Sequence, residues 1–209
     1  MLQFITHKTE RFDEIEGARL ALEGGCRWIQ LRMKDAPVEE VIAKGKSLVD
    51  ITRSYGAKLI IDDHVELVDE IGADGVHLGK NDMPVAEARA VLENTKIIGA
   101  TANTFSDIIA AVKAGADYIG LGPYRFTQTK KKLSPVLGIG GYMDIMLRYD
   151  ERELTIPVVA IGGITDADVA VLMSTGIAGI AVSGTILNAQ DPVEATRKLL
   201  AEIENVQNE

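Results

Sequence analysis

The feature that most constrains the fold of this chain is its regular alternation of short apolar stretches with longer amphipathic ones. Eight short stretches have the composition of buried strands, and each precedes a stretch with helical periodicity, at about 26 residues per pair. The strands are predicted at 3–6, 28–32, 58–61, 75–78, 96–100, 118–121, 157–161 and 179–182. Alternating strands and helices predict a parallel sheet, and eight pairs predict a closed (β/α)8 TIM barrel of the α/β class. We expect residues 1–209 to form one such domain.

The helices are predicted from apolar residues that recur every three or four positions. Residues 37–53 are the clearest case, with Val41, Ile42 and Leu48 on one face and Pro37 in the first turn. The other helices are predicted at 10–23, 65–71, 84–93, 106–114, 142–149, 166–175 and 192–206.

A doubly wound open sheet is the alternative with the same alternation. That fold would carry a glycine-rich fingerprint directly after the first strand, and Ile5-Thr6-His7-Lys8 has none. Three helix–strand junctions also resemble one another, because Gly72, Gly115 and Gly176 each end a helical stretch before an apolar strand. Glycine suits these positions since it accepts the left-handed conformation that often ends a helix.

Composition excludes several classes of function. The formal net charge of −9 argues against a nucleic-acid surface, which needs a basic face. The single cysteine, Cys26, excludes an intramolecular disulfide and provides no metal-site spacing. No apolar run approaches the length that spans a membrane, and the first residues do not resemble a signal peptide. We therefore expect a cytoplasmic protein without nucleic-acid or membrane partners.

In a TIM barrel the active site lies where the strands end, so the residues after each strand carry the functional prediction. At the end of the second strand, Gln30, Arg32 and Lys34 alternate with apolar residues and share one face. Inward-facing charge of this kind is costly unless it meets an anion or a carboxylate. The pattern therefore predicts either an anion site or an arginine paired with an acid inside the barrel.

Carboxylates follow the third and fourth strands. Asp62 and Asp63 end one strand, and Asp82 follows the next, so neighbouring parallel strands bring Asp63 and Asp82 to the same rim. Two carboxylates without a histidine or cysteine cluster suit Mg²⁺, whose other ligands usually include substrate phosphate. Helix N-capping by Asp62 or Asp82 is the structural alternative.

Phosphate binding is predicted at two further places. Glycine-rich turns follow the seventh strand, at Gly163, and the eighth, at Ser183 and Gly184, where barrels commonly bind phosphate through backbone N–H groups. A long polar loop follows the sixth strand, and there Thr127, Thr129 and Lys130 offer two hydroxyl groups and a cation to phosphate. A solvated charge run is the alternative for this loop.

The histidines are less informative. His77 lies in the middle of a predicted strand, where a hydrogen-bonded core histidine is the expected role. His64 lies beside the aspartates and is a candidate for substrate contact, and the role of His7 at the end of the first strand stays open.

Taken together, these motifs resemble the thiamine phosphate synthase (thiamine-phosphate pyrophosphorylase) family, which includes the thiazole tautomerases. The resemblance runs from the second strand to the last helix. The motifs that carry it are Gln30-x-Arg32-x-Lys34, Asp62-Asp63, His77-Leu-Gly-Lys-Asn-Asp82, Gly120-Leu-Gly-Pro123, Thr127-Gln-Thr129-Lys130, Gly162-Gly163-Ile164 and Ser183-Gly184. It implies a transferase of thiamine biosynthesis that joins hydroxymethylpyrimidine pyrophosphate to a thiazole phosphate and releases pyrophosphate. The two substrates are the expected partners, and a homodimer is consistent with the resemblance.

The resemblance also implies roles for individual residues. Asp63 and Asp82 would hold Mg²⁺ on the pyrophosphate, and Arg32, Lys34 and Lys130 would neutralise its charge as it departs. The thiazole phosphate would be held by two hydroxyl groups and three loop positions: Thr127, Thr129, Gly163, Ser183 and Gly184. Gln30, Asp62 and Thr101 are assigned to substrate binding, with Thr101 standing where the family usually has serine.

Three substitutions distinguish this chain from the usual pattern. Asp62 stands where the synthases usually have asparagine, and a carboxylate accepts hydrogen bonds but does not donate them. Lys80 replaces a common glutamine, and Asn103 replaces the histidine that the tautomerases use as acid and base. The last change favours a synthase over a tautomerase. A phosphate-binding paralogue without catalysis is the third hypothesis.

Overall fold

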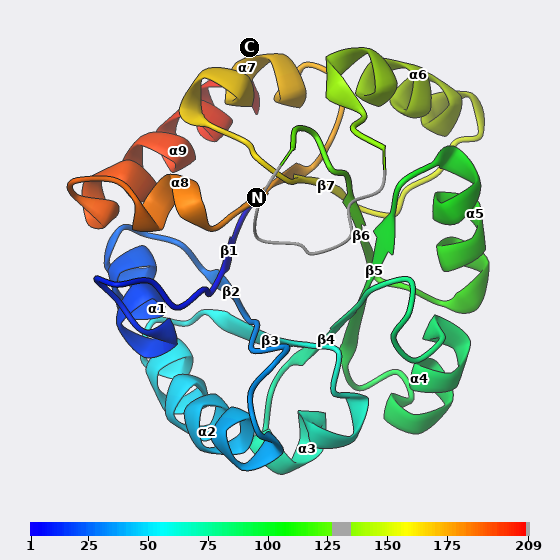
Figure 1. Ribbon diagram of the computed structural model, residues 1–209. Helices are drawn as coiled ribbons and strands as arrows, with labels where there is room; N and C mark the ends of the chain where they lie inside the picture. The colour runs from blue at the N-terminus through cyan, green and yellow to red at the C-terminus, as the bar shows by residue number, and fades with distance from the viewer. Residues whose placement is uncertain (127–134, 208–209) are drawn as a thin grey trace.

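The computed structural model describes residues 1–126 and 135–207. Eight parallel strands close into a barrel in sequence order, and β1 completes it by pairing with β8 (Figure 1). The strands are β1 (Leu2–Ile5), β2 (Trp28–Leu31), β3 (Lys58–Asp62), β4 (Gly75–Leu78), β5 (Ile97–Ala102), β6 (Tyr118–Leu121), β7 (Val158–Ile161) and β8 (Gly179–Val182). The predicted (β/α)8 barrel is confirmed, and the open-sheet alternative is wrong.

Helices surround the barrel on its outside (Figure 1). They are α1 (Glu14–Glu23), α2 (Val38–Ser54), α3 (Val68–Ile71), α4 (Val85–Leu92), α5 (Phe105–Ala114), α6 (Gly138–Glu151), α7 (Val169–Met173), α8 (Gly184–Leu187) and α9 (Pro192–Gln207), with 3-10 turns η1 (Val65–Leu67) and η2 (Asp166–Asp168). Within the described ranges no helix is long and apolar enough to cross a membrane.

Local sequence signals explain most helix ends. A capping box starts α1, where the Asp13 side chain accepts hydrogen bonds from the backbone of Ile15 and Glu16. Gly72 and Gly115 end α3 and α5 in the left-handed conformation, as predicted. Three predictions differ from the structure: α1 begins at Glu14 rather than at 10, α6 begins at Gly138 rather than at 142, and α8 was not predicted. A single helical turn such as α8 is too short to show a period.

Apolar residues form two separate layers. The larger core lies between the strands and the helices, and Ile29 and Leu31 of β2 face into it, as predicted from the alternation. A small core inside the barrel includes Ile5, Tyr118 and Val159. Between this small core and the C-terminal ends of the strands, the side chains that point into the barrel are polar. The ends of the strands therefore carry the groups that can contact a ligand.

Candidate active site

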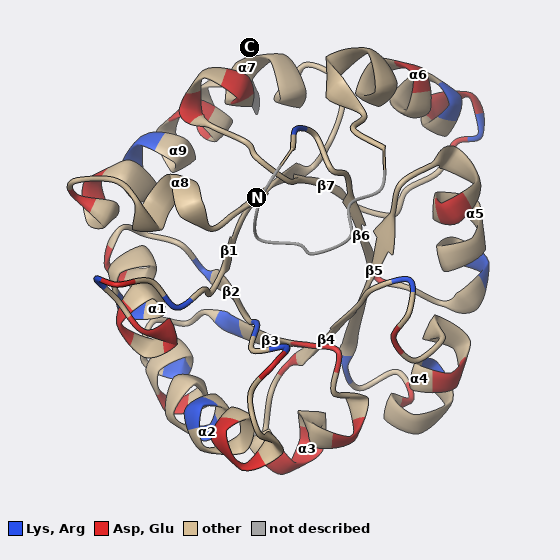
Figure 2. Cartoon of the chain, viewed as in Figure 1, with Lys and Arg blue, Asp and Glu red and all other residues tan. Residues whose placement is uncertain are grey.

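Charged residues of both signs meet where β2, β3 and β4 end. Figure 2 shows most other charges on the outer helices. The Arg32 Nε lies 3.8 Å from Asp62 Oδ2, and the Lys34 Nζ lies 3.8 Å from the same oxygen. Lys34 also lies 3.7 Å from Asp82 Oδ1. The Asp62 side chain is 7% exposed and that of Lys34 is 35% exposed, so the cations stand between the acids and solvent.

Asp63 and Asp82 lie at the ends of neighbouring strands, and the backbone fixes both. Asp63 has φ of 76°, a left-handed conformation rare for a residue with a side chain, and its N–H donates to the His77 carbonyl at 2.9 Å. Asp82 Oδ2 accepts from the Gly79 N–H at 2.6 Å. The helix-capping alternative is wrong for Asp62 and Asp82, because the caps before the next helical segments are His64 and Pro84.

A hydrogen-bonded chain crosses the barrel interior below these charges. Gln3 Nε2 donates to the Tyr118 hydroxyl at 3.2 Å, and that hydroxyl lies 3.0 Å from His77 Nδ1. The other ring nitrogen, His77 Nε2, lies 3.0 Å from Thr101 Oγ1. His77 is therefore the hydrogen-bonded core histidine that its mid-strand position predicts.

Gln30 lies in the same interior. Its side chain is buried, and its Nε2 makes no hydrogen bond with the residues that the structure describes. Burial raises the pKa of Tyr118 well above its usual range, and the neighbouring amides of Gln3 and Gln30 oppose that rise. The Gln30 amide thus retains donor capacity that a ligand can use.

The glycine-rich turns after β7 and β8 form a second polar area. Gly162 and Gly163 have φ of 99° and 66°, and a Cβ at position 163 would lie 3.0 Å from Arg125 Cβ. Ser183 caps α8, and its Oγ is buried without a hydrogen-bond partner in the described ranges. Gly184 is the first residue of α8.

An ion pair that the sequence analysis did not foresee borders this area. Arg125 follows β6, and both of its terminal nitrogens lie 2.7 Å from the Asp168 carboxylate. Arg125 also donates to the Gly163 carbonyl at 2.9 Å. Hydrogen bonds from Arg125 hold the pKa of Asp168 far below its usual range.

The remaining predicted residues divide into two groups. Thr127, Thr129 and Lys130 lie outside the described residues. Lys80 pairs with Asp107 at 2.7 Å, and the Asn103 amide donates to the Gly122 carbonyl. His64 Nδ1 lies 3.1 Å from a carboxylate oxygen of Glu66, and His7 is exposed.

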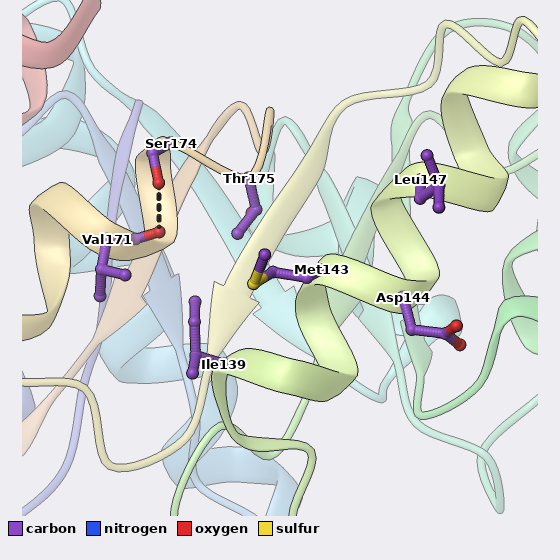
Figure 3. Close-up of a pocket in the computed structure, with 7 residues that line it drawn as sticks. All are labelled: Ile139, Met143, Asp144, Leu147, Val171, Ser174 and Thr175. Carbon is purple, nitrogen blue, oxygen red and sulfur yellow. Dashed lines mark hydrogen bonds between the residues drawn. The ribbon is translucent and has the colours of Figure 1, made fainter.

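A large described groove lies elsewhere, between α6 and α7. It encloses about 490 Å³ and is lined by Met143, Leu147 and Val171 among others (Figure 3). The Ser174 hydroxyl at its edge donates to the Val171 carbonyl at 2.9 Å. This groove is shallow and mainly apolar, and it holds none of the predicted site residues, so the strand ends remain the candidate active site.

A family model, curated relatives and a solved structure with high sequence identity point to one family. The family model described as thiamine monophosphate synthase matches residues 2–186. The chain is 60% identical over 199 residues to a thiamine-phosphate synthase of Phocaeicola vulgatus, covering 95% of this chain and 96% of the relative. It is 56% identical to one of Bacteroides thetaiotaomicron over 95% of each chain. A solved thiamine phosphate pyrophosphorylase from Pyrococcus furiosus superposes with a TM-score of 0.85 at 38% identity, covering 98% of this chain and 96% of that one.

Proposed function

The chain belongs to the thiamine monophosphate synthase family, and on this premise we propose how its residues make thiamine phosphate. The protein is a transferase that condenses hydroxymethylpyrimidine pyrophosphate with thiazole phosphate. The bond between the pyrimidine methylene carbon and the pyrophosphate oxygen breaks, and its electron pair leaves with pyrophosphate. The thiazole nitrogen then donates its lone pair to that carbon, which completes thiamine phosphate.

The observation that carries the proposal is the charge cluster at the ends of β2, β3 and β4. Arg32 and Lys34 would bind the pyrophosphate and neutralise the charge that grows as it leaves. Asp62 and Asp82 hold both cations near the strand ends before the substrate arrives, so little reorganisation remains for the reaction itself. Lys130 is assigned the same role by the sequence analysis.

Asp63 and Asp82 suit Mg²⁺ as the metal. No trio of histidine, cysteine or acidic residues that could hold a metal occurs within the described ranges. The proposed donor set is the pair of carboxylates that follows β3 and β4. Magnesium accepts such a pair because substrate oxygens and water complete its six ligands. When bound, Mg²⁺ would supply positive charge to the phosphate oxygens. Lys34 Nζ lies 3.7 Å from Asp82 Oδ1, so it would stand beside both the metal ligand and the pyrophosphate.

The thiazole phosphate would bind at the turns after β7 and β8. Ser183 supports this assignment, because its buried Oγ makes no hydrogen bond in the described ranges and a phosphate oxygen would provide one. Backbone N–H groups at Gly163 and Gly184 would add donors, since glycine leaves the backbone open to close approach. Thr127 and Thr129 are assigned the same phosphate from the sequence.

The pyrimidine would occupy the barrel interior between these two anion sites. Gln30 supports this placement because its buried Nε2 lacks a partner among the described residues and can donate to a ring nitrogen. Thr101 would lie near the ring or the departing pyrophosphate, and Asp62 is assigned to the pyrimidine from the sequence.

The position of Asn103 argues against a thiazole tautomerase. Its amide donates to the Gly122 carbonyl, and an amide carries no proton that it can exchange as an acid or base near neutral pH. The side chain ties the end of β5 to the end of β6 instead.

The proposal is tested by pyrophosphate release from both substrates with Mg²⁺. We expect release only when both substrates and the metal are present, and a loss of at least about a hundredfold in Asp63→Asn and Asp82→Asn. Raised Mg²⁺ should partly restore each variant, because weakened binding of a metal is offset by its concentration.

Asp144→Asn is the matched control, since Asp144 is an exposed aspartate beside the distant groove. Its activity should equal that of the unchanged protein. Full activity in EDTA would contradict the assignment of Asp63 and Asp82 to a metal, and absence of pyrophosphate release under all conditions would contradict the proposed function.

A further inference from the structure

The hydrogen bonds of the buried chain have a direction, and Gln3 fixes it. The Gln3 Nε2 group can only donate, so the Tyr118 oxygen acts as acceptor in their 3.2 Å contact. The Tyr118 hydroxyl has one proton of its own, and the arrangement proposed below gives that proton to His77 Nδ1, which lies 3.0 Å away. Burial keeps that proton on the tyrosine because it raises the Tyr118 pKa.

This direction determines the tautomer of His77. An Nδ1 that accepts from Tyr118 carries no proton, so the neutral ring carries its proton on Nε2. His77 Nε2 then donates to Thr101 Oγ1 at 3.0 Å. The Thr101 hydroxyl proton is not used in that bond, and it remains for an acceptor at the ends of the strands, where Thr101 is half-buried.

The surrounding residues hold the chain rigidly. Gln3, His77 and Tyr118 are 2%, 6% and 3% exposed. A Cβ at Gly99 would lie 2.1 Å from the Tyr118 ring, and a Cβ at Gly120 would lie 2.9 Å from the His77 ring. Two neighbouring strands therefore carry glycine where these rings lie, and the packing leaves the rings a single arrangement.

We propose that Gln3, Tyr118 and His77 are positioning residues that make Thr101 an obligatory hydrogen-bond donor toward the bound pyrimidine pyrophosphate. The inference rests on the proposed function, which puts substrate at Thr101. A donor suits this place, because the leaving pyrophosphate gains negative charge during the reaction and can only accept. With the opposite direction, Thr101 would give its proton to His77 and offer the substrate a lone pair.

The tautomer can be measured directly. Long-range ¹H–¹⁵N correlation spectra of protein labelled with ¹⁵N-histidine separate protonated from unprotonated ring nitrogens. The chain has three histidines, and His7→Gln and His64→Gln assign the two outside the barrel interior. We expect an unprotonated Nδ1 and a protonated Nε2 for His77. A proton on Nδ1 would overturn the inference, and this measurement leaves Gln3, His77, Thr101 and Tyr118 unchanged.

Kinetics test the consequence for catalysis. Tyr118→Phe removes the donor to His77, so kcat should fall about tenfold while KM for the pyrimidine pyrophosphate changes less than about threefold. Thr101→Val should lose more, and Thr101→Ser should recover at least about tenfold over Thr101→Val because it restores the hydroxyl. Adding Tyr118→Phe to Thr101→Val should change kcat by less than about twofold, since the two residues act through one bond.

Tyr149→Phe is the matched control. The Tyr149 hydroxyl donates to the Ile156 carbonyl at 2.6 Å, away from the strand ends. Tyr149→Phe therefore removes a hydrogen-bonded hydroxyl group, as Tyr118→Phe does, but should leave kcat unchanged. If the unchanged protein is active and the fall in kcat of the double variant equals the product of the falls in Thr101→Val and Tyr118→Phe, the inference is overturned. Failure of the proposed function would differ, because the unchanged protein itself would then release no pyrophosphate.

Discussion

At the scale of single residues, the proposed function makes Asp62 the residue that sets how much positive charge faces the substrate. Its carboxylate lies 3.8 Å from both Arg32 and Lys34, so it would compete with a bound pyrophosphate for the two cations. The carboxylate thus holds the cations in position and also weakens their attraction for an anion.

Asp62→Asn should therefore strengthen anion binding. We expect KM for the pyrimidine pyrophosphate, and the inhibition constant of pyrophosphate, to fall about fivefold, which corresponds to the loss of one partly solvated ion-pair interaction. Steady-state kinetics with pyrophosphate as a product inhibitor measure both constants.

Asp69→Asn provides the control for that change. It removes an exposed aspartate that pairs with Lys96 at 3.1 Å on the outside of the barrel, so both constants should stay the same. If Asp62→Asn instead raised KM, the carboxylate would be a direct substrate contact rather than a competitor.

At the scale of elements, Arg125 and Asp168 join the segment after β6 to the turn after β7. Arg125 pairs with Asp168 through two hydrogen bonds and also donates to the Gly163 carbonyl. Thr165 donates to the same carboxylate from its backbone and its hydroxyl. This connection fixes Gly163, so it supports the proposed thiazole phosphate site without touching the phosphate.

The ion pair should make the free energy of unfolding depend on pH in the acidic range. Because the Asp168 pKa is lowered in the folded state, the pair stabilises the fold above the unfolded pKa of about 3.9 and loses this effect as pH falls below it. We expect Arg125→Ala to be less stable than the unchanged protein at pH 7, with the difference shrinking below about pH 4. Urea denaturation at several pH values measures it.

Arg148→Ala is the control for the loss of an arginine that lies over an aromatic ring. Arg148 lies over the Phe105 ring as Arg125 lies over the Tyr124 ring, with distances of 4.4 Å and 4.9 Å. Its loss should give a stability difference that does not change with pH. A pH-independent difference for Arg125→Ala as well would mean that Asp168 contributes nothing to the connection.

At the scale of the whole molecule, closure of the barrel depends on the first strand meeting the last. Leu2, Gln3 and Phe4 of β1 pair with β8, and the Ile180 N–H donates to the Met1 carbonyl at 3.0 Å. Closure also brings Gln3 beside residues of the middle strands, so the interior chain exists only in the closed barrel.

Gly179→Ala should therefore destabilise the whole barrel. A Cβ at this position would lie 1.9 Å from the Met1 carbonyl oxygen, which is backbone and cannot turn away. We expect the free energy of unfolding to fall by about 3 kcal/mol, measured by urea denaturation.

Gly140→Ala is the matched control on the surface. Nothing lies within 4 Å of a Cβ there, and the residue is helical, so the free energy of unfolding should rise by up to about 1 kcal/mol. A Gly179→Ala protein as stable as the unchanged one would show that β1 and β8 do not close the barrel in solution.

The sequence by itself determined the order of elements and the level at which the polar residues lie. Strand and helix periods are local properties, so the run Gln30, Leu31, Arg32 already placed alternate side chains on opposite faces of β2. The glycine turns at 163 and 184 and the aspartates after β3 and β4 were visible for the same reason.

Only the tertiary structure decided which of these residues meet. Gln3 and Tyr118 are 115 positions apart, and Arg125 and Asp168 are 43 apart. Such pairs depend on the register of strands around a closed barrel and on glycines that leave space for a neighbouring ring. No local period encodes either, because both arise when separate strands pack together.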